Sequence, residues 1–595
     1  RPSAQGFNSK AELYNNKAYY TRNSLSARSY ITFGTVREEA RLYGLKLTMN
    51  FGTDYTDYQR TLVYDKEHGN AAQQGGHLSK TNTRTLSYTF NQLLTYDRTF
   101  GDHFLNLLAG HEYYRYKYNY ALGEKTGIVG GIDELGPAVT TTDNNSYSHN
   151  YGVESYLARI NYGFKSRYYI DASWRTDGSS RFHPSDRWGH FWSVGASWRI
   201  SEEQFMENPC QWLDNLTLKV SYGVQGNDNL GTYYAWQGLY DYTWPNATDA
   251  GAFVDKLENR KVTWEKNGNL NAGIEATMFG GRLGVSVEYY NRKTRDMLLN
   301  SPLPISTGFT GFNDNVGSLR NQGLEVSLRG TILDKRDFRW DATLMGSFNR
   351  NKVLSLTGGQ DVITSGIRVI EVGRPIYTFY LPKTAGVDPA TGKQLYYAYW
   401  TQTVNDEGTL VNTRCDEYIT DNVAMATLSK YYHESREPKL FGSIGSTFTI
   451  LKNIDVSFLT TYSIGGWVYD GLYKGSMYVQ YAGNNWHKNA KRRWQKPGDK
   501  TDVPMLEVGG SYATASNSLI DASYFAIKNI TVGYTLPKRW LKKIDIESLR
   551  IYATLDNIAM FNHMDGMDPQ YNFTGSVAYS YTPSRVIAFG IDLNF

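Results

Sequence analysis

The last stretch of the chain has two chemically different faces, and this pattern constrains the fold more than any other feature. From Val586 to Phe595 the odd positions carry large apolar side chains, and the even positions carry small or polar ones. Such alternation is typical of a β-strand that separates an apolar environment from a polar one. The apolar positions are Ile587, Phe589, Ile591, Leu593 and Phe595.

The same two-faced pattern recurs about 17 times along the chain, and the connections between recurrences alternate in length. Short connections are expected near residues 36, 100, 165, 205, 280, 334, 452 and 541, and long ones near 70, 135, 182, 247, 306, 395, 492 and 570. In a soluble sandwich, nothing requires the connections at one end of the strands to be short in every hairpin. The pattern predicts an all-β fold, a transmembrane antiparallel β-barrel with short periplasmic turns and long extracellular loops.

The first strands are expected at about 28–35, 42–57, 82–97 and 104–118. Residues 1–27 are polar and read as irregular, and the residues after Tyr120, to about 152, read as a long connection rich in glycine and threonine.

The composition agrees with a barrel and argues against several other classes of protein. The chain contains 48 Tyr, 14 Trp and 25 Phe, and Tyr and Trp are favoured at a bilayer interface. No apolar run approaches the roughly 18 residues of a helical membrane span. A net charge of +4 over 595 residues gives no support to nucleic-acid binding.

Several segments, in order, resemble the SusC/RagA family of TonB-dependent outer-membrane transporters. The most distinctive are DGSSRF within Tyr168–Asn227, KNITVGYTLP within Asp521–Pro537, and the final GIDLNF. The likeness also includes Leu257–Asn267, Asn291–Leu303, Ser306–Val316, Phe348–Leu356, Gly386–Gly392 and Arg493–Pro504.

This resemblance implies a barrel of about 22 strands with a plugged lumen. Residues 1–595 are then expected to be the C-terminal part of such a barrel, with the plug and the N-terminal extension absent from this chain. The family also implies a SusD-like surface lipoprotein partner, a dimer of such pairs, and coupling to TonB-ExbB-ExbD through the missing N-terminal parts. Phe595 is expected to serve as the outer-membrane assembly signal.

The polar residues give little sign of catalysis or metal binding. The histidines fall in no helical metal motif and in no triad signature. His183 and His190 lie near Asp186 in the sequence, but loop polarity explains them better than a metal site. Asp388 in Gly386–Gly392 suits a turn better than a calcium loop. We therefore expect no enzyme activity, no catalytic residue, no metal and no cofactor.

The aromatic residues of the long loops are the stronger functional candidates, because flat aromatic faces suit sugar rings and peptide side chains. The expected substrate or partner contacts are Trp236, Trp244, Tyr397, Trp400, Tyr478 and Trp486. The alternative is that these residues form an interfacial girdle or pack loops together. The largest loops, about 351–440 and 466–520, are expected to contact the lipoprotein, since long loops are usually functional.

The function expected from the resemblance is active import of oligosaccharides, or oligopeptides, across a bacterial outer membrane. The alternative within membrane proteins is a passive porin or adhesive scaffold without energy coupling. A third possibility, a soluble carbohydrate-binding all-β protein, would partition into buffer without detergent.

Overall fold

The structure is a computed structural model that describes most of the chain. The described residues are 9–35, 43–206, 211–356, 361–477, 486–507, 510–541, 546–564, 566–570, 574–577 and 582–594.

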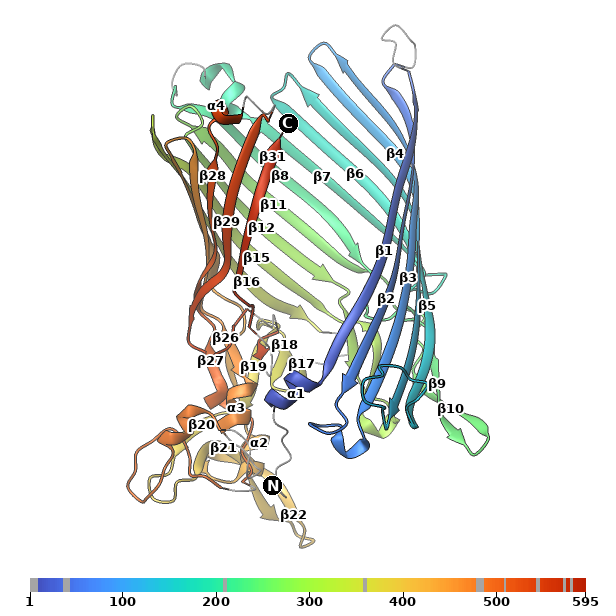
Figure 1. Ribbon diagram of the computed structural model, residues 1–595, viewed down its shortest axis with the longest axis vertical. Coiled ribbons are helices and arrows are strands. Elements are labelled where there is room, and N and C mark those ends of the chain that lie inside the picture. Colours follow the sequence, from blue (N-terminus) through green and yellow to red (C-terminus); the bar gives the residue numbers. More distant parts are fainter. Residues whose placement is uncertain are drawn as a thin grey trace. The chain divides into compact units, whose positions relative to one another are not determined.

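Long antiparallel strands dominate the described part (Figure 1), and 17 of them belong to one sheet. The number predicted from the sequence is therefore confirmed. The strands are β1 (Lys17–Gly34), β2 (Leu45–Tyr64), β3 (His77–Phe100), β4 (His103–Thr126), β5 (Thr140–Phe164), β6 (Tyr168–Ser179), β7 (Trp188–Arg199), β8 (Leu213–Asn227), β11 (Glu265–Met278), β12 (Leu283–Arg295), β15 (Ser318–Lys335), β16 (Phe338–Ser355), β24 (Leu440–Ile450), β25 (Ile454–Ile464), β28 (Tyr524–Thr535), β29 (Ser548–Asn562) and β31 (Val586–Asn594).

Shorter strands build small sheets within the long connections. They are β9 (Leu239–Asn246), β10 (Asp249–Lys256), β13 (Leu298–Pro302), β14 (Gly311–Asn315), β17 (Val362–Ser365), β18 (Arg368–Glu371), β19 (Thr378–Pro382), β20 (Thr384–Val387), β21 (Gln394–Val404), β22 (Leu410–Thr420), β23 (Lys430–Ser435), β26 (Trp467–Asp470), β27 (Leu519–Asp521) and β30 (Ser576–Val577). The long connections are thus folded segments with their own backbone pairing.

Among the described residues, helices are few and short. The α-helices are α1 (Ser9–Asn15), α2 (Val423–Leu428), α3 (Gly471–Met477) and α4 (Lys538–Leu541). The 3₁₀ helices are η1 (Ala72–Gln74), η2 (Ile200–Glu202), η3 (Gln204–Met206), η4 (Ile305–Thr307), η5 (Lys488–Arg492) and η6 (Ser516–Ser518). In the described part of the chain, no helix is both long and apolar enough to cross a membrane.

Several of the predicted short connections are tight turns whose backbone fixes the register of the strands. The predicted alternation in length is wrong near 205, because the connection at 200–212 contains η2 and η3 and is longer than the connection at 180–187, which was predicted to be long. Lys165 and Ser166 both have φ of 52° between β5 and β6. Leu451 and Lys452 have φ of 50° and 62° between β24 and β25. Two consecutive residues with positive φ match the right-handed twist of the flanking strands. The predicted turns near 165 and 452 are confirmed.

The strands near the N-terminus extend further than the sequence predicted. The expectation that residues 1–27 are irregular is wrong for residues 17–27, which belong to β1 and pair with β2. The predicted connection from after Tyr120 to about 152 is also too long, because β4 continues to Thr126 and β5 begins at Thr140. Neither face of these extensions is continuously apolar, so the pattern that marks a lipid-facing strand is absent from them.

The described chain divides into two compact units. The first comprises Arg1–Ser197, Ser221–Asn269 and Thr294–Val316, and the second comprises Trp198–Val220, Leu270–Lys293 and Gly317–Phe595.

In the first unit, β5 shows the separation of faces clearly. Tyr156 and Ile160 are exposed on one face, whereas Ser155 on the other face is buried. Ser155 Oγ accepts a hydrogen bond of 2.9 Å from the Arg175 guanidinium on β6. The same guanidinium lies 3.0 Å from the Glu112 carboxylate on β4. One face of this sheet is therefore apolar, and the other carries a hydrogen-bonded polar network.

In the second unit, one arginine joins strands on the polar face. Arg550 on β29 lies 2.7 Å from the Asp455 carboxylate on β25 and 3.1 Å from the Asp592 carboxylate on β31. Gly533 on β28 lies under the arginine, and a Cβ there would come within 2.6 Å of Arg550 Nη2. The glycine allows the arginine to cross a whole strand to reach Asp455.

We expect Arg550→Met to destabilise the barrel by about 1 kcal/mol, because the partly buried Asp455 and the exposed Asp592 would both lose their cation. The measurement is the unfolding temperature of the full-length protein in detergent, followed by heat-dependent mobility on gels. The control is Arg336→Met, which removes the same charge from the exposed β15–β16 turn. An equal loss in both variants would contradict the assignment.

Candidate functional site

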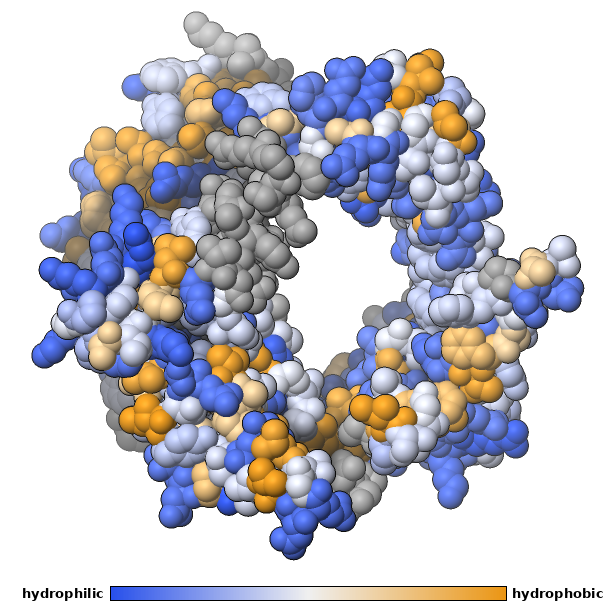
Figure 2. Space-filling model, turned by 90° about the horizontal axis from the view of Figure 1, so that it is seen from below, coloured by the Kyte–Doolittle hydropathy of each residue, from blue (hydrophilic) through white to orange (hydrophobic). Residues whose placement is uncertain are grey.

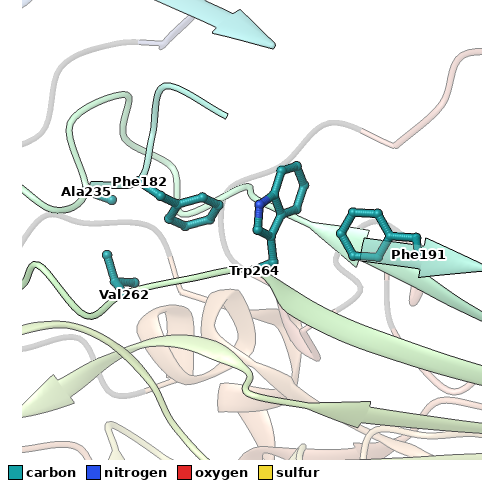
Figure 3. Close-up of a cluster of buried hydrophobic side chains, with 5 residues drawn as sticks. All are labelled: Phe182, Phe191, Ala235, Val262 and Trp264. Atoms are coloured by element: carbon teal, nitrogen blue, oxygen red, sulfur yellow. The ribbon is translucent and has the colours of Figure 1, made fainter. Parts of the chain in front are cut away.

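A buried aromatic cluster stabilises the long connections of the first unit (Figure 3). The Trp264 ring is centred 5.4 Å from Phe182 and 5.2 Å from Phe191, and its Nε1 donates a 2.7 Å hydrogen bond to the Arg187 carbonyl. Phe182 and Val262 are fully buried. The members of the cluster are Phe182, Phe191, Ala235, Val262 and Trp264. These contacts give the connections a core of their own.

Trp236, a predicted ligand contact, packs against this cluster. It is partly buried, and its ring meets His183 edge-on at 4.9 Å. The His183 ring is further fixed by its Nδ1, which lies 2.7 Å from Ser185 Oγ. Trp236 therefore contributes to loop packing, and its role in ligand binding remains a prediction.

The described residues contain no group of three or more His, Cys, Asp and Glu placed to hold a metal ion. Of the histidines considered above, His183 contacts Trp236, and His190 stacks on Trp174 at 6.3 Å.

Trp244 lies on the β9–β10 hairpin and is 65% exposed. Its ring is centred 6.0 Å from Phe253 on the paired strand. The side chain is therefore accessible to a ligand or partner, as the prediction requires, but no contact in the structure tests that role.

Two further candidates lie on β21 in the second unit. Tyr397 is partly buried, and Lys383 Nζ lies 4.5 Å from its ring centre. Trp400 is also partly buried, and its carbonyl accepts a 2.8 Å hydrogen bond from the Tyr418 hydroxyl. The neighbouring Tyr396 is buried, and this burial raises its pKa to about 12. In this loop Tyr396 therefore packs in the interior, whereas Tyr397 and Trp400 are partly exposed.

Trp486 packs against a small core formed by Met477, Ala490 and Val503. Tyr478 and Phe595, the remaining candidates, lie outside the described residues.

Asp388 forms a turn. Its carboxylate accepts hydrogen bonds from the Thr391 hydroxyl and from the Ala390 backbone N–H. These bonds lower the pKa of Asp388, with the threonine hydroxyl as the largest cause. The indole N–H of Trp494 donates to the Pro389 carbonyl at 2.9 Å and fixes the turn further. The sequence analysis preferred a turn to a calcium loop here, and the hydrogen bonds of Asp388 are those of a turn.

A second aromatic group, on β4, β5 and the connection after β8, was not predicted. Across the two strands, Tyr118 stacks on His149 at 5.8 Å, and Tyr120 stacks on Tyr147 at 4.7 Å. Tyr233 caps the group, with its ring centred 5.1 Å from His149. We call this group the aromatic ladder and define it as Tyr116, Tyr118, Tyr120, Tyr147, His149, Tyr151 and Tyr233.

A charged pair holds one end of the ladder. The Arg181 guanidinium lies 4.6 Å from the Tyr151 ring centre and 5.3 Å from that of Tyr233. Arg181 also pairs with the Asp228 carboxylate, which accepts a 2.7 Å hydrogen bond from the Tyr151 hydroxyl and a 2.6 Å bond from Ser179 Oγ. Both charges are therefore engaged within the protein, and the adjacent rings are fixed.

The sequence did contain a signal for the ladder. Tyrosine occupies alternate positions at 114, 116, 118 and 120, which places these side chains on one face of a strand. The cross-strand partners could not be found, because Tyr147, His149 and Tyr151 fall in a segment that was predicted to be a connection.

The end of the molecule seen in Figure 2 is mostly hydrophilic, with separate hydrophobic patches between the blue residues.

Comparison with known proteins identifies the family of the chain. Residues 1–558 match the family described as TonB dependent receptor-like, beta-barrel. The chain belongs to this family. The predicted transmembrane β-barrel is thereby confirmed, as is the resemblance to TonB-dependent transporters.

Curated relatives extend the match. The chain is 27% identical over 568 residues to the TonB-dependent receptor SusC of Bacteroides thetaiotaomicron, covering 93% of this chain and 54% of SusC. It is 26% identical over 551 residues to the TonB-dependent receptor P3 of Formosa agariphila, covering 87% of this chain and 53% of the relative. The chain thus spans about half the length of these relatives.

A solved structure agrees with these matches. The RagAB peptide transporter aligns with a TM-score of 0.83 and 26% identity over 98% of this chain and 63% of the matched chain. The fold of this chain is therefore similar to that of the matched RagAB chain.

Glu437 is a half-buried carboxyl group in the connection between β23 and β24. Its backbone N–H donates to Ser435 Oγ at 3.2 Å. Burial raises the pKa of Glu437 from 4.5 to about 7. The folded state therefore holds this proton more tightly than the unfolded state does.

We expect the local stability around Glu437 to fall as the pH rises from about 4.5 to about 7 and then to level off, because in this window the unfolded state releases the proton first. Glu437→Gln removes this dependence, and at pH 8 it should stabilise the segment by up to about 3 kcal/mol. The measurement is the hydrogen-exchange protection of residues 436–441 in the full-length protein.

The control is Glu434→Gln, an exposed carboxyl group on the adjacent β23, which should leave the pH dependence unchanged. Equal pH profiles for the Glu437 variant and the unmodified protein would show that the burial of this group does not affect local stability.

Proposed function

We propose that the chain is the C-terminal part of a SusC-like barrel that imports oligosaccharides or oligopeptides across the bacterial outer membrane. The observation that carries this proposal is the match to the TonB-dependent receptor barrel family over residues 1–558. The relatives named SusC and RagAB support it, and the second of these is described as a peptide transporter. In this proposal the plug and the TonB-contacting segment belong to parts of the protein outside this chain.

In the proposed mechanism, the barrel provides the passage and the loops receive the substrate. A SusD-like lipoprotein delivers the substrate to the long loops, and TonB-ExbB-ExbD supplies energy through the N-terminal parts. This chain performs no covalent chemistry, so specificity depends on side chains of the polar face and the loops. Two such lipoprotein-bound barrels pair as a dimer.

The rival function is a passive porin or adhesive scaffold. The two functions differ in energy dependence, because an active importer needs the proton-motive force and a passive pore does not.

We expect cells that carry the full-length protein and its lipoprotein to accumulate labelled oligosaccharide or oligopeptide only while the inner membrane is energised. The measurement is uptake with and without a protonophore, with surface binding at low temperature as the control. Uptake that continues unchanged after the proton-motive force collapses would favour the passive pore.

The β21–β22 hairpin is a specific candidate for lipoprotein contact. It lies within the loop expected to bind the partner, and Val404 and Leu410 near its tip are each 65% exposed. Val404 and Leu410 are cross-strand partners, so they form one small exposed apolar patch that a partner can cover. Gln402 and Asn412 face each other across the hairpin, so a two-residue turn between them would shorten it without breaking the pairs below.

We expect replacement of residues 403–411 by Asn-Gly to weaken copurification of the lipoprotein by about tenfold, because the apolar tip is lost while a two-residue turn preserves the pairing below it. The control is Val404→Thr with Leu410→Thr, which keeps the length of the hairpin and tests the apolar contact alone. Unchanged copurification in both variants would remove this hairpin from the interface.

A further inference from the structure

The aromatic ladder lies on the polar face of its sheet. Tyr147, His149 and Tyr151 alternate along β5 in register with the buried Ser155, which belongs to the polar network of that face. Tyr156 and Ile160 occupy the opposite, apolar face. In a transmembrane barrel the apolar face contacts lipid and the polar face lines the lumen. Lipid contact therefore does not explain the ladder.

The height of the ladder along the strand gives the same conclusion. At the level of Tyr116, Tyr118 and Tyr120, the opposite face of β4 carries Arg115, Lys117 and Asn119, which are all exposed. Such residues are costly in the hydrocarbon region. The ladder thus lies beyond the lipid, toward the long connections, at the end of the barrel where substrate enters in the proposed function.

We propose that the aromatic ladder binds the rings of a neutral oligosaccharide. The ladder rings stack on one another, as Tyr118 does on His149 and Tyr120 on Tyr147, so they form a rigid aromatic surface that ends in a ring open to a ligand. Tyr147 at its end is 43% exposed and offers an accessible ring. The apolar faces of sugar rings fit such surfaces, and the tyrosine hydroxyls can donate to and accept from sugar hydroxyls.

The charges near the ladder favour a neutral ligand over a peptide. Recognition of a peptide terminus or of an ionised side chain calls for a counter-charge that is free to pair. Arg181 and Asp228 are paired with each other, and the Asp228 carboxylate also accepts from Tyr151 and Ser179. This pair therefore acts as a support that orients the rings of Tyr151 and Tyr233 before the ligand arrives.

This inference rests on the proposed function, since it assigns a substrate class to the same importer. It adds a specific location for ring stacking that the predicted loop residues Trp236 and Trp244 did not provide.

The test uses the full-length protein with its lipoprotein in detergent. The probes are neutral hexasaccharides of glucose, mannose, galactose and xylose, with an uncharged capped hexapeptide library as the comparison. Affinity is measured by calorimetry, and ring contact is measured by magnetisation transfer from aromatic protons to the protons of the sugar. We expect at least one hexasaccharide to bind, and Tyr147→Leu to weaken that binding about fivefold.

The matched control is Tyr156→Leu on the same strand. Tyr156 is 45% exposed, close to the 43% of Tyr147, but lies on the apolar face. It should leave saccharide binding unchanged. Both variants should keep the heat-dependent mobility of the folded barrel.

The proposal is overturned if no hexasaccharide binds, if both variants bind the saccharide equally, or if only peptide binding depends on Tyr147. Energised uptake in cells is measured separately. Import of a peptide that is independent of Tyr147 would therefore reject the saccharide site while leaving the import function intact.

Discussion

Pairing of the strand backbones is the constraint on which the rest of the structure depends. In a bilayer the peptide N–H and C=O groups find no water, so each strand must pair with a neighbour. The chain meets this need locally, because consecutive long strands pair antiparallel, as β3 with β4 and β4 with β5. The short turns at one end, with positive φ at residues such as Lys165 and Ser166, fix the register of the pairs. Register then decides which side chains face lipid.

The polar face adds a second level of organisation. Arg550 connects Asp455 and Asp592 across the second unit. It can do so because Gly533 on β28 has no side chain, so the guanidinium can pass over that strand. In the first unit Arg175 has the same kind of role toward Glu112 and Ser155. Each arginine satisfies groups on several strands, so polar residues that face away from lipid stabilise the sheet and also shape a hydrophilic surface.

The long connections depend on cores of their own. Phe182 and Trp264 are buried together, although both lie in connections outside the strands. The DGSSRF segment gains a physical explanation here, because Ser179 and Arg181 bind Asp228 while Phe182 enters the aromatic cluster. Aromatic residues in such segments therefore have two uses. Trp236 packs, whereas Trp244 on its hairpin is exposed.

The sequence by itself determined the barrel class, the number of long strands and the positions of tight turns such as those near 165 and 452, because lipid imposes a period of two on the strands. The predicted alternation of connection lengths fails between 180–187 and 200–212. The prediction of strands from the sequence failed for the strand ends that lie outside the bilayer. Residues 17–27, and the ends of β4 and β5, are strands because a neighbour pairs with them, and their own polarity gives no sign of it. Only the tertiary structure brought Tyr118 opposite His149 and placed Tyr233 beside them, since contacts between distant segments depend on register and packing, which a single sequence does not reveal.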